Sequence, residues 1–266
     1  MNKITKWKTL RYLACGLVLL AAPALAVDSA LGGGGTPAAP ADLPLGPGDN
    51  WIDHFDTYAT GSQLHGQGGW EGWGNSVGAG ALTSDVQARS LPNSVDIFGA
   101  SDLTHPYTGY TTGTWVYTAW QYIPTGTTGN TYFILLNTYS NDPACTGCNW
   151  STQVCFNPTL GTVIDDVAAD CAGASTINII YDQWVELRLV INLDTDTQTF
   201  FYNGQQLYQD TWTGHISGGG AVNIATVDLF ANNATSVFYD DISLSTMPFL
   251  DGFELGGTTE WHATFP

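Results

Sequence analysis

Beyond its first 26 residues the chain has almost no positive charge. The whole sequence holds 6 lysines and arginines against 24 aspartates and glutamates, and only Arg89 and Arg188 lie after Ala26. Without that first segment the formal charge is 2 − 24 = −22. Nucleic acids and anionic membranes are bound through cations that displace counterions, so this balance excludes both as partners. A neutral glycan or another extracellular surface ligand fits it better.

The sequence also lacks an apolar run of the ~20 residues that a membrane-spanning helix needs. The apolar run after Leu13 ends by Ala26, follows a basic start, and offers Ala-Leu-Ala as a cleavage site. This pattern predicts that residues 1–26 are a signal peptide and that the protein is secreted, with the periplasm or cell surface as alternatives. Residues 27–50, rich in Gly, Pro and Ala, are predicted to be a flexible linker.

Cysteine is scarce, and four cysteines remain after the predicted cleavage. An even number in an exported chain predicts two disulfides, with three possible pairings. We favour Cys155–Cys171 and Cys145–Cys148. A metal or redox role for the Cys-Thr-Gly-Cys segment is the alternative, although a second CxxC or nearby histidines are missing.

Amphipathic helices are absent from the pattern between Trp51 and Leu244, where short alternating apolar runs are separated by turn residues. The clearest is the segment Trp184–Gly204, in which two alternating arms flank a polar turn and Asn-Gly follows the second arm. A possible third strand follows at Gln206–Trp212. So many strands over about 190 residues, with no helix between them, predict a single all-β sandwich.

Four stretches then resemble a known family: Asp53-His-Phe-Asp-Thr-Tyr with the Gly- and Trp-rich run to Trp73, residues 87–94, the 184–204 hairpin, and the ending Phe-Tyr-Asp-Asp-Ile-Ser-Leu at 238–244. They resemble signatures of concanavalin A-like, laminin-G-like jelly rolls of secreted bacterial proteins. The resemblance implies a two-sheet antiparallel jelly-roll sandwich over residues 51–246, with residues 247–266 as a tail. This fold hosts lectins, hydrolases and lyases alike, so it does not imply an activity.

A jelly roll places its first and last strands side by side, which brings Asp53 and Asp56 next to Asp240 and Asp241. Families that the chain resembles carry a structural calcium at about this place, and calcium takes six to eight oxygen ligands. We therefore expect a structural calcium held by Asp56 and Asp241 with Asp53 or Asp240. The alternative is that these carboxylates are solvated turn residues.

Catalytic patterns are missing. The Glu-x-Asp-x-x-Glu strand of β-glucan hydrolases with this fold is absent, as are a Gly-x-Ser-x-Gly elbow and a Walker loop. The four glutamates are dispersed, so only a pair brought together by folding could serve a glycosidase. Glu186 is the best single candidate, with Arg188 two residues on, and a surface ion pair between the two is the alternative.

The aromatic residues suggest that the protein binds carbohydrate. Trp70 and Trp73 lie in a Gly-rich segment, where bulky side chains in a loop need a reason, and sugar rings stack on aromatic faces. Trp120 and Tyr122 share one face of a strand whose other face carries Trp115 and Tyr117. One set therefore packs in the core, and the other is available to bind a ligand. The predicted ligand-binding residues are Trp70, Trp73, Trp120, Tyr122, Glu186 and Arg188.

Together these observations predict a secreted, calcium-stabilised jelly-roll module that binds carbohydrate or another surface ligand without catalysis. A glycoside hydrolase or polysaccharide lyase of the same fold is one alternative. A structural or adhesive protein of the envelope or matrix is another. The tail at residues 247–266 is either a recognition or export tag, an ordered edge segment or a frayed end.

Overall fold

The structure is a computed structural model that describes residues 50–246. The predicted signal peptide, the linker up to residue 49 and the tail at 247–266 lie outside the described residues. Residues 50–246 form fifteen β-strands and two short 3-10 helices. No helix in this range is long and apolar enough to cross a bilayer.

The strands divide into two sheets. The eight-stranded sheet contains β1 (Trp51–Asp53), β3 (Leu82–Ser84), β4 (Ser94–Ile97), β6 (Thr114–Tyr122), β11 (Trp184–Asn192), β12 (Thr197–Tyr202), β13 (Gln205–Thr211) and β15 (Val237–Thr246). The seven-stranded sheet contains β2 (Glu71–Gly72), β5 (Asp102–Pro106), β7 (Asn130–Thr138), β8 (Asn149–Asn157), β9 (Thr162–Asp165), β10 (Thr176–Asn178) and β14 (Thr226–Asn232). The 3-10 helices are η1 (Trp73–Asn75) and η2 (Val77–Ala79).

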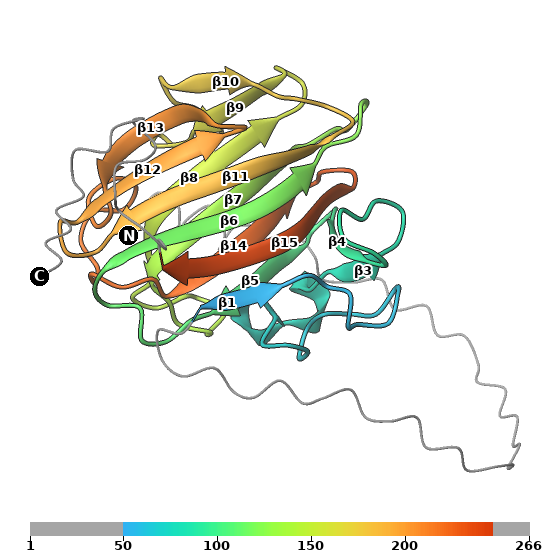
Figure 1. Cartoon of the computed structure of the whole chain (residues 1–266), viewed down its shortest axis with the longest axis horizontal. Coiled ribbons are helices and arrows are strands. Elements are labelled where there is room, and N and C mark those ends of the chain that lie inside the picture. Colours follow the sequence, from blue (N-terminus) through green and yellow to red (C-terminus); the bar gives the residue numbers. More distant parts are fainter. Residues whose placement is uncertain (1–49, 247–266) are drawn as a thin grey trace, which may run out of the picture.

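All strand pairs are antiparallel, and the chain crosses repeatedly between the two layers (Figure 1). The order is β13-β12-β11-β6-β15-β4-β3 in one sheet and β10-β9-β8-β7-β14-β5-β2 in the other. Strand β1 pairs with β15, with Asp53 opposite Ile242, so the first and last strands lie side by side. The predicted all-β, two-sheet antiparallel jelly-roll sandwich is confirmed.

The hairpin around which the eight-stranded sheet is built forms as the alternation predicts. Strands β11 and β12 pair from Leu187 opposite Tyr202 to Asn192 opposite Thr197. The next turn holds Asn203 and Gly204 at φ of 48° and 75°. Positive φ at both central residues is the type I′ geometry that suits the twist of a hairpin, which explains the Asn-Gly pair.

The main core lies between the sheets. On β6 and β11 buried and partly exposed residues alternate without exception, so each strand gives one face to the core and one to solvent. Trp115 and Tyr117 are on the core face of β6, whereas Trp120 and Tyr122 are on the outer face. The question that the sequence left open for these two sets is thereby answered.

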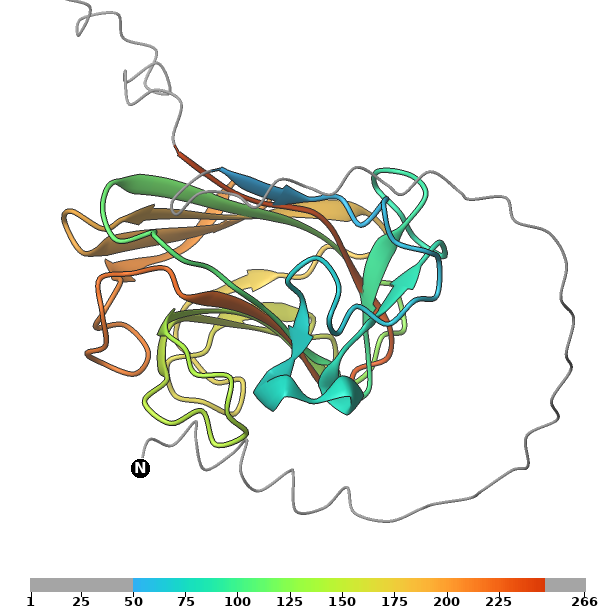
Figure 2. The same ribbon diagram turned by 90° about the horizontal axis from the view of Figure 1, so that it is seen from below.

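The outer face of the seven-stranded sheet is covered as well. On β7, Phe133 and Leu135 belong to the main core, while the alternating Tyr132, Ile134 and Leu136 belong to a second apolar cluster. Figure 2 shows η1, η2 and neighbouring loops on the far side of this sheet. We call this cluster the second apolar cluster; its buried members are Trp73, Ala79, Tyr132, Ile134, Leu136, Cys145, Trp150, Cys155, Ile164, Cys171 and Phe230.

The two disulfides hold loops of this covering layer. Cys145 pairs with Cys148 in the β7–β8 loop, and Cys155 of β8 pairs with Cys171 in the β9–β10 loop. These are the pairs that the sequence analysis favours. Three of the four cysteines are buried in the second apolar cluster, so the disulfides fasten the loops directly onto it.

Candidate functional site

Four of the six predicted ligand-binding residues meet on the outer face of the eight-stranded sheet. Glu186 lies opposite Trp120 in the β11–β6 register, and Trp184 lies opposite Tyr122. The rings of Trp184 and Tyr122 have centroids 5.6 Å apart at an interplanar angle of 59°. Because β6 and β11 are adjacent, these partly exposed side chains form one continuous surface, which we call the open face.

The only two arginines beyond Ala26 both lie on the open face. The guanidinium of Arg89 sits 3.8 Å from the centroid of the Trp120 ring, and that of Arg188 sits 4.6 Å from the Phe201 ring. Each arginine therefore makes a cation–π contact that holds it flat against the sheet. Arg188 Nε is also 3.8 Å from Glu186 Oε2, the surface ion pair that was the alternative to a catalytic Glu186.

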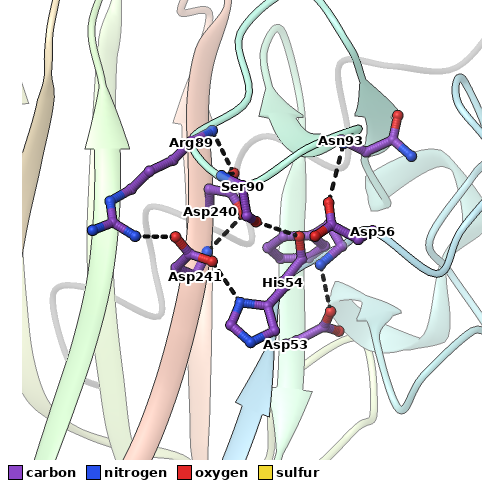
Figure 3. Close-up of polar contacts among 9 residues, drawn as sticks. Asp53, His54, Asp56, Arg89, Ser90, Asn93, Asp240 and Asp241 are labelled. Atoms are coloured by element: carbon purple, nitrogen blue, oxygen red, sulfur yellow. Dashed lines mark hydrogen bonds and ion pairs between the residues drawn. The ribbon is translucent and has the colours of Figure 1, made fainter.

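Next to Trp120 the two ends of the domain meet in a corner of polar contacts (Figure 3). Asp240 is fully buried and lies opposite Trp120 in the β15–β6 register, at a bulge between Asp240 and Ser243. Its Oδ2 accepts hydrogen bonds from the backbone N–H of Arg89 at 2.7 Å and of Ser90 at 3.0 Å. These bonds anchor the β3–β4 loop, which carries Arg89 over Trp120.

The pKa values of Asp240 and Asp241 shift in opposite directions although the two residues are neighbours. Burial raises the pKa of Asp240 to about 6, despite hydrogen bonds from the N–H groups of Arg89, Asp241 and Ser90. Burial also acts to raise the pKa of Asp241, but bonds from His54, Arg89 and Ser90 outweigh it and hold that pKa below its ordinary value. His54 Nδ1 is 2.5 Å from Asp241 Oδ1, and the Arg89 guanidinium binds the other oxygen.

The other two predicted calcium ligands are engaged with donors too. Asp53 accepts hydrogen bonds from the Trp70 indole at 2.8 Å, the Tyr58 hydroxyl at 2.7 Å and the Phe55 N–H at 2.8 Å. Burial raises the pKa of Asp53 in spite of these bonds. Asp56 accepts from the N–H of Asn93 at 3.3 Å. The predicted convergence of acidic residues from both ends of the chain is therefore present.

This corner does not fit calcium. N–H and O–H donors, an arginine and a histidine point at its carboxylates, whereas a calcium cage needs oxygens directed at a common empty centre. Across residues 50–246 no group of three or more His, Cys, Asp and Glu is placed so that it could hold a metal ion. The paired aspartates also lie within β15 at a bulge, with Asp241 at φ of 45°, and not at the strand's end.

The structure corrects the prediction that Trp70 and Trp73 bind a ligand. Trp70 is 0% exposed and packs on Phe55 between ring centroids 5.5 Å apart, while Trp73 is 2% exposed and stacks on Trp150 at 6.1 Å. The Gly-rich segment that suggested an exposed loop instead folds back onto the domain, because its glycines allow the tight turns that bury both rings. Neither ring is open to a ligand.

Three open-face residues were missed by the sequence reasoning. Trp184 lies on the same face of β11 as Glu186, and Phe201 lies at an outward position of β12. The period-2 alternation of the two strands therefore could have predicted both as exposed residues. Arg89 had no such signal, because its position over Trp120 depends on how the β3–β4 loop crosses the sheet. The structure adds these three to Trp120, Tyr122, Glu186 and Arg188.

The covered sheet carries polar groups of its own. Glu71, Thr104 and Asp228 form one cross-strand row, since Thr104 of β5 is opposite both Glu71 and Asp228. Tyr139 lies 3.2 Å from the Thr104 hydroxyl. Burial raises the pKa of Tyr139, and the charges of Asp228, Asp102 and Glu71 add to the rise. Several carboxylates therefore lie together on this face. Within residues 50–246 no arginine or lysine lies beside them, because both arginines contact the other sheet.

No protein-family model and no curated protein matches the sequence. Among solved structures, the chain is similar to a sialidase with 8% identity and a TM-score of 0.48, over 75% of this chain and 19% of that one. An alginate lyase in complex with alginate trisaccharide has 10% identity and a TM-score of 0.44, over 76% and 100% of the two chains. A galectin of Caenorhabditis elegans has 12% identity and a TM-score of 0.37, over 56% and 95%. Similarities this distant carry no argument about ligand or reaction, and the fold class rests on the sheet topology above.

Proposed function

We propose that this protein is a secreted module that binds carbohydrate, without catalysis, through the open face of the eight-stranded sheet. One observation carries the proposal: Tyr122, Trp184 and Trp120 are partly exposed and adjacent on a regular sheet, with Glu186 and two arginines around them. Aromatic rings offer a sugar ring an apolar stacking surface, and the charged groups beside them hydrogen-bond its hydroxyls. Tyr122 and Trp184 are the stacking pair, because Arg89 already covers Trp120.

The charge of the open face favours a neutral glycan. Arg89 and Arg188 are offset there by Asp241 and Glu186, so the face is close to neutral on a chain whose formal charge is −18 overall. An anionic polysaccharide would meet a strongly negative protein and find both cations already paired. A neutral oligosaccharide faces no such repulsion.

The proposal is tested by retention on a panel of immobilised neutral glycans. We expect the wild type to be retained and the variant combining Tyr122→Ala with Trp184→Ala to bind roughly tenfold more weakly, as expected for the loss of stacking contacts. Tyr181→Ala is the matched control, since this partly exposed ring packs against the main core and its hydroxyl donates to the carbonyl of Pro158. Retention of the double variant at the wild-type level would overturn the proposal. No retention of the wild type on any glycan would favour the structural or adhesive alternative.

A second candidate function is glycan cleavage on the covered sheet. The row Glu71, Thr104, Asp228 places two carboxylates two strand spacings apart, about 10 Å between backbones at ~4.8 Å per spacing. That is close to the separation that inverting glycosidases use. Asp228 is fully buried, so this candidate requires the covering loops to move before a glycan can reach it. Release of reducing ends by the wild type, abolished by Glu71→Gln, would support it. Unsaturated products absorbing in the ultraviolet would indicate a lyase instead, and the absence of both products would exclude this candidate.

A secreted location follows from the predicted signal peptide and agrees with two disulfides in the described part of the chain. Disulfides form and persist in oxidising compartments, whereas thiols of cytosolic proteins stay reduced. The measurement that tests it is the mass of the protein recovered from the medium or periplasm. A product beginning after Ala26 is expected, and a full-length product in the cytosol would contradict it.

A further inference from the structure

His215 lies in the loop between β13 and β14. Its side chain is 4% exposed. Nε2 is 2.8 Å from Asp165 Oδ1 on β9, and Nδ1 is 3.1 Å from Asp210 Oδ2 on β13. The imidazole stacks on the ring of Tyr208 with centroids 4.4 Å apart at 23°. One ring therefore joins the loop to strands of both sheets.

Two carboxylates on one imidazole define its protonation state. A neutral imidazole has one N–H donor and one acceptor nitrogen, so it would place a lone pair against one of the carboxylates. Only the imidazolium donates to both. Burial acts to lower the pKa of His215, but the bonds and charges of Asp165 and Asp210 outweigh it, and the pKa is raised. Burial keeps the third neighbour, Tyr208, uncharged by raising its pKa well above the ordinary value.

The residues that follow His215 close the loop over the seven-stranded sheet. Ile216 packs against the second apolar cluster. The N–H of Ser217 donates to the carbonyl of Trp150 at 3.1 Å, and the Ser217 hydroxyl accepts from the Trp150 N–H at 3.1 Å. The carbonyls of Gly218 and Gly219 accept from Asn149 and Asn137. Apart from these contacts the three consecutive glycines at 218–220, all at positive φ, give the segment little rigidity of its own.

We propose that His215 is a pH-operated latch, which as an imidazolium fastens the β13–β14 loop over the second apolar cluster and on deprotonation releases it. The sign follows from the geometry. The latch contributes its full stability below the unfolded-state pKa of His215, about 6.5. This contribution is lost as pH rises through the folded-state pKa, which is higher. Alkaline conditions loosen residues 213–220 and uncover Ile216 and Trp150, while the open face on the other sheet is unaffected.

The experiment is amide hydrogen exchange of the full chain from pH 5 to 9, corrected for intrinsic rates, with a parallel NMR titration of His215. We expect protection at residues 216–219 to fall with a midpoint above pH 6.5 that matches the histidine titration. Asp210→Asn removes one partner at an exposed carboxylate and should lower both midpoints by roughly one unit. Asp85→Asn, at an exposed aspartate elsewhere, should leave them unchanged.

Two results would overturn the latch. Protection at 216–219 that stays constant from pH 5 to 9 would show that the loop is held without the imidazolium. A His215 titration midpoint below 6.5, or one that Asp210→Asn does not move, would show that the two carboxylates do not govern its charge. Neither result depends on whether the open face binds a glycan.

Discussion

The outer faces of the two sheets differ in how far they are buried. On β6 and β11 every second residue is partly exposed, whereas on β7 and β8 the seven central residues are all buried. The seven-stranded sheet achieves this with four loops, two disulfides and a second apolar cluster. The aromatic residues of the covered sheet are thus accounted for by packing, while those of the open face are not. This difference is why we propose the open face as the ligand-binding surface.

The largest expected effect contrasts one tryptophan from each face. Trp150 is 1% exposed in the second apolar cluster, so Trp150→Ala should lower the free energy of unfolding by about 3–5 kcal/mol. Trp120 is partly exposed, and Trp120→Ala should cost about 1 kcal/mol, mainly the cation–π contact with Arg89. Urea unfolding of both variants measures the two costs. Equal costs would mean that the two faces are not packed differently.

The disulfides of the covered sheet come next. The Cys155–Cys171 bond closes a loop with a sequence separation of 16, and its replacement by two serines should cost about 3 kcal/mol through unfolded-chain entropy. Cys145–Cys148 spans a separation of 3, so its removal should cost less, roughly 2 kcal/mol. Denaturant unfolding under oxidising conditions ranks the two pairs. The reverse order would show that loop entropy does not set their effect.

The corner beside the open face should show a pH dependence from Asp240. Its folded-state pKa of about 6 lies above the ordinary value of 3.8, so the stability it contributes is present below about pH 4 and lost as pH rises through 6. Asp240→Asn has no such loss. The unfolding free energy of the wild type minus that of Asp240→Asn should therefore decline from pH 4 to 7, with Asp85→Asn as the control. A difference that is constant over this range would contradict the assignment.

The smallest expected effect is that of chelation. Arg89, His54 and backbone N–H groups already satisfy the corner carboxylates, so EDTA should leave the midpoint of thermal unfolding unchanged. Added calcium should also have no effect. A midpoint that falls with EDTA and recovers with calcium would restore the structural calcium that the family resemblance implied, and the donors around Asp241 would then have to rearrange.

The sequence predicted those parts of the fold that period-2 alternation describes. The hairpin of β11 and β12 and its Asn203-Gly204 turn follow from single-strand patterns. The same alternation separates Trp120 and Tyr122 from Trp115 and Tyr117 on β6, but it does not say which pair faces outward. Strand β5 (Asp102–Pro106) lacks this alternation, because Asp-Leu-Thr-His-Pro has one aliphatic residue and ends in proline, yet its first four residues are buried.

The candidate site was harder to predict because it depends on contacts between distant segments. Trp70 and Trp73 were assigned to a ligand because a glycine-rich loop usually lies on the surface, yet here it packs as a layer. Calcium was expected at Asp241 because the resembling families carry one at about this place, whereas in the structure Arg89, 152 residues away, is the partner of this carboxylate. Local pattern does not encode such pairings.

The most direct test of the central claim is hydroxyl-radical footprinting with and without a neutral oligosaccharide retained by the protein. Tyr122 and Trp184 on the open face should lose reactivity on binding, while Tyr139 on the covered sheet and Tyr181 beyond β10 should not change. Protection of Tyr139 with Tyr122 and Trp184 unaltered would contradict the account and move the ligand to the other sheet.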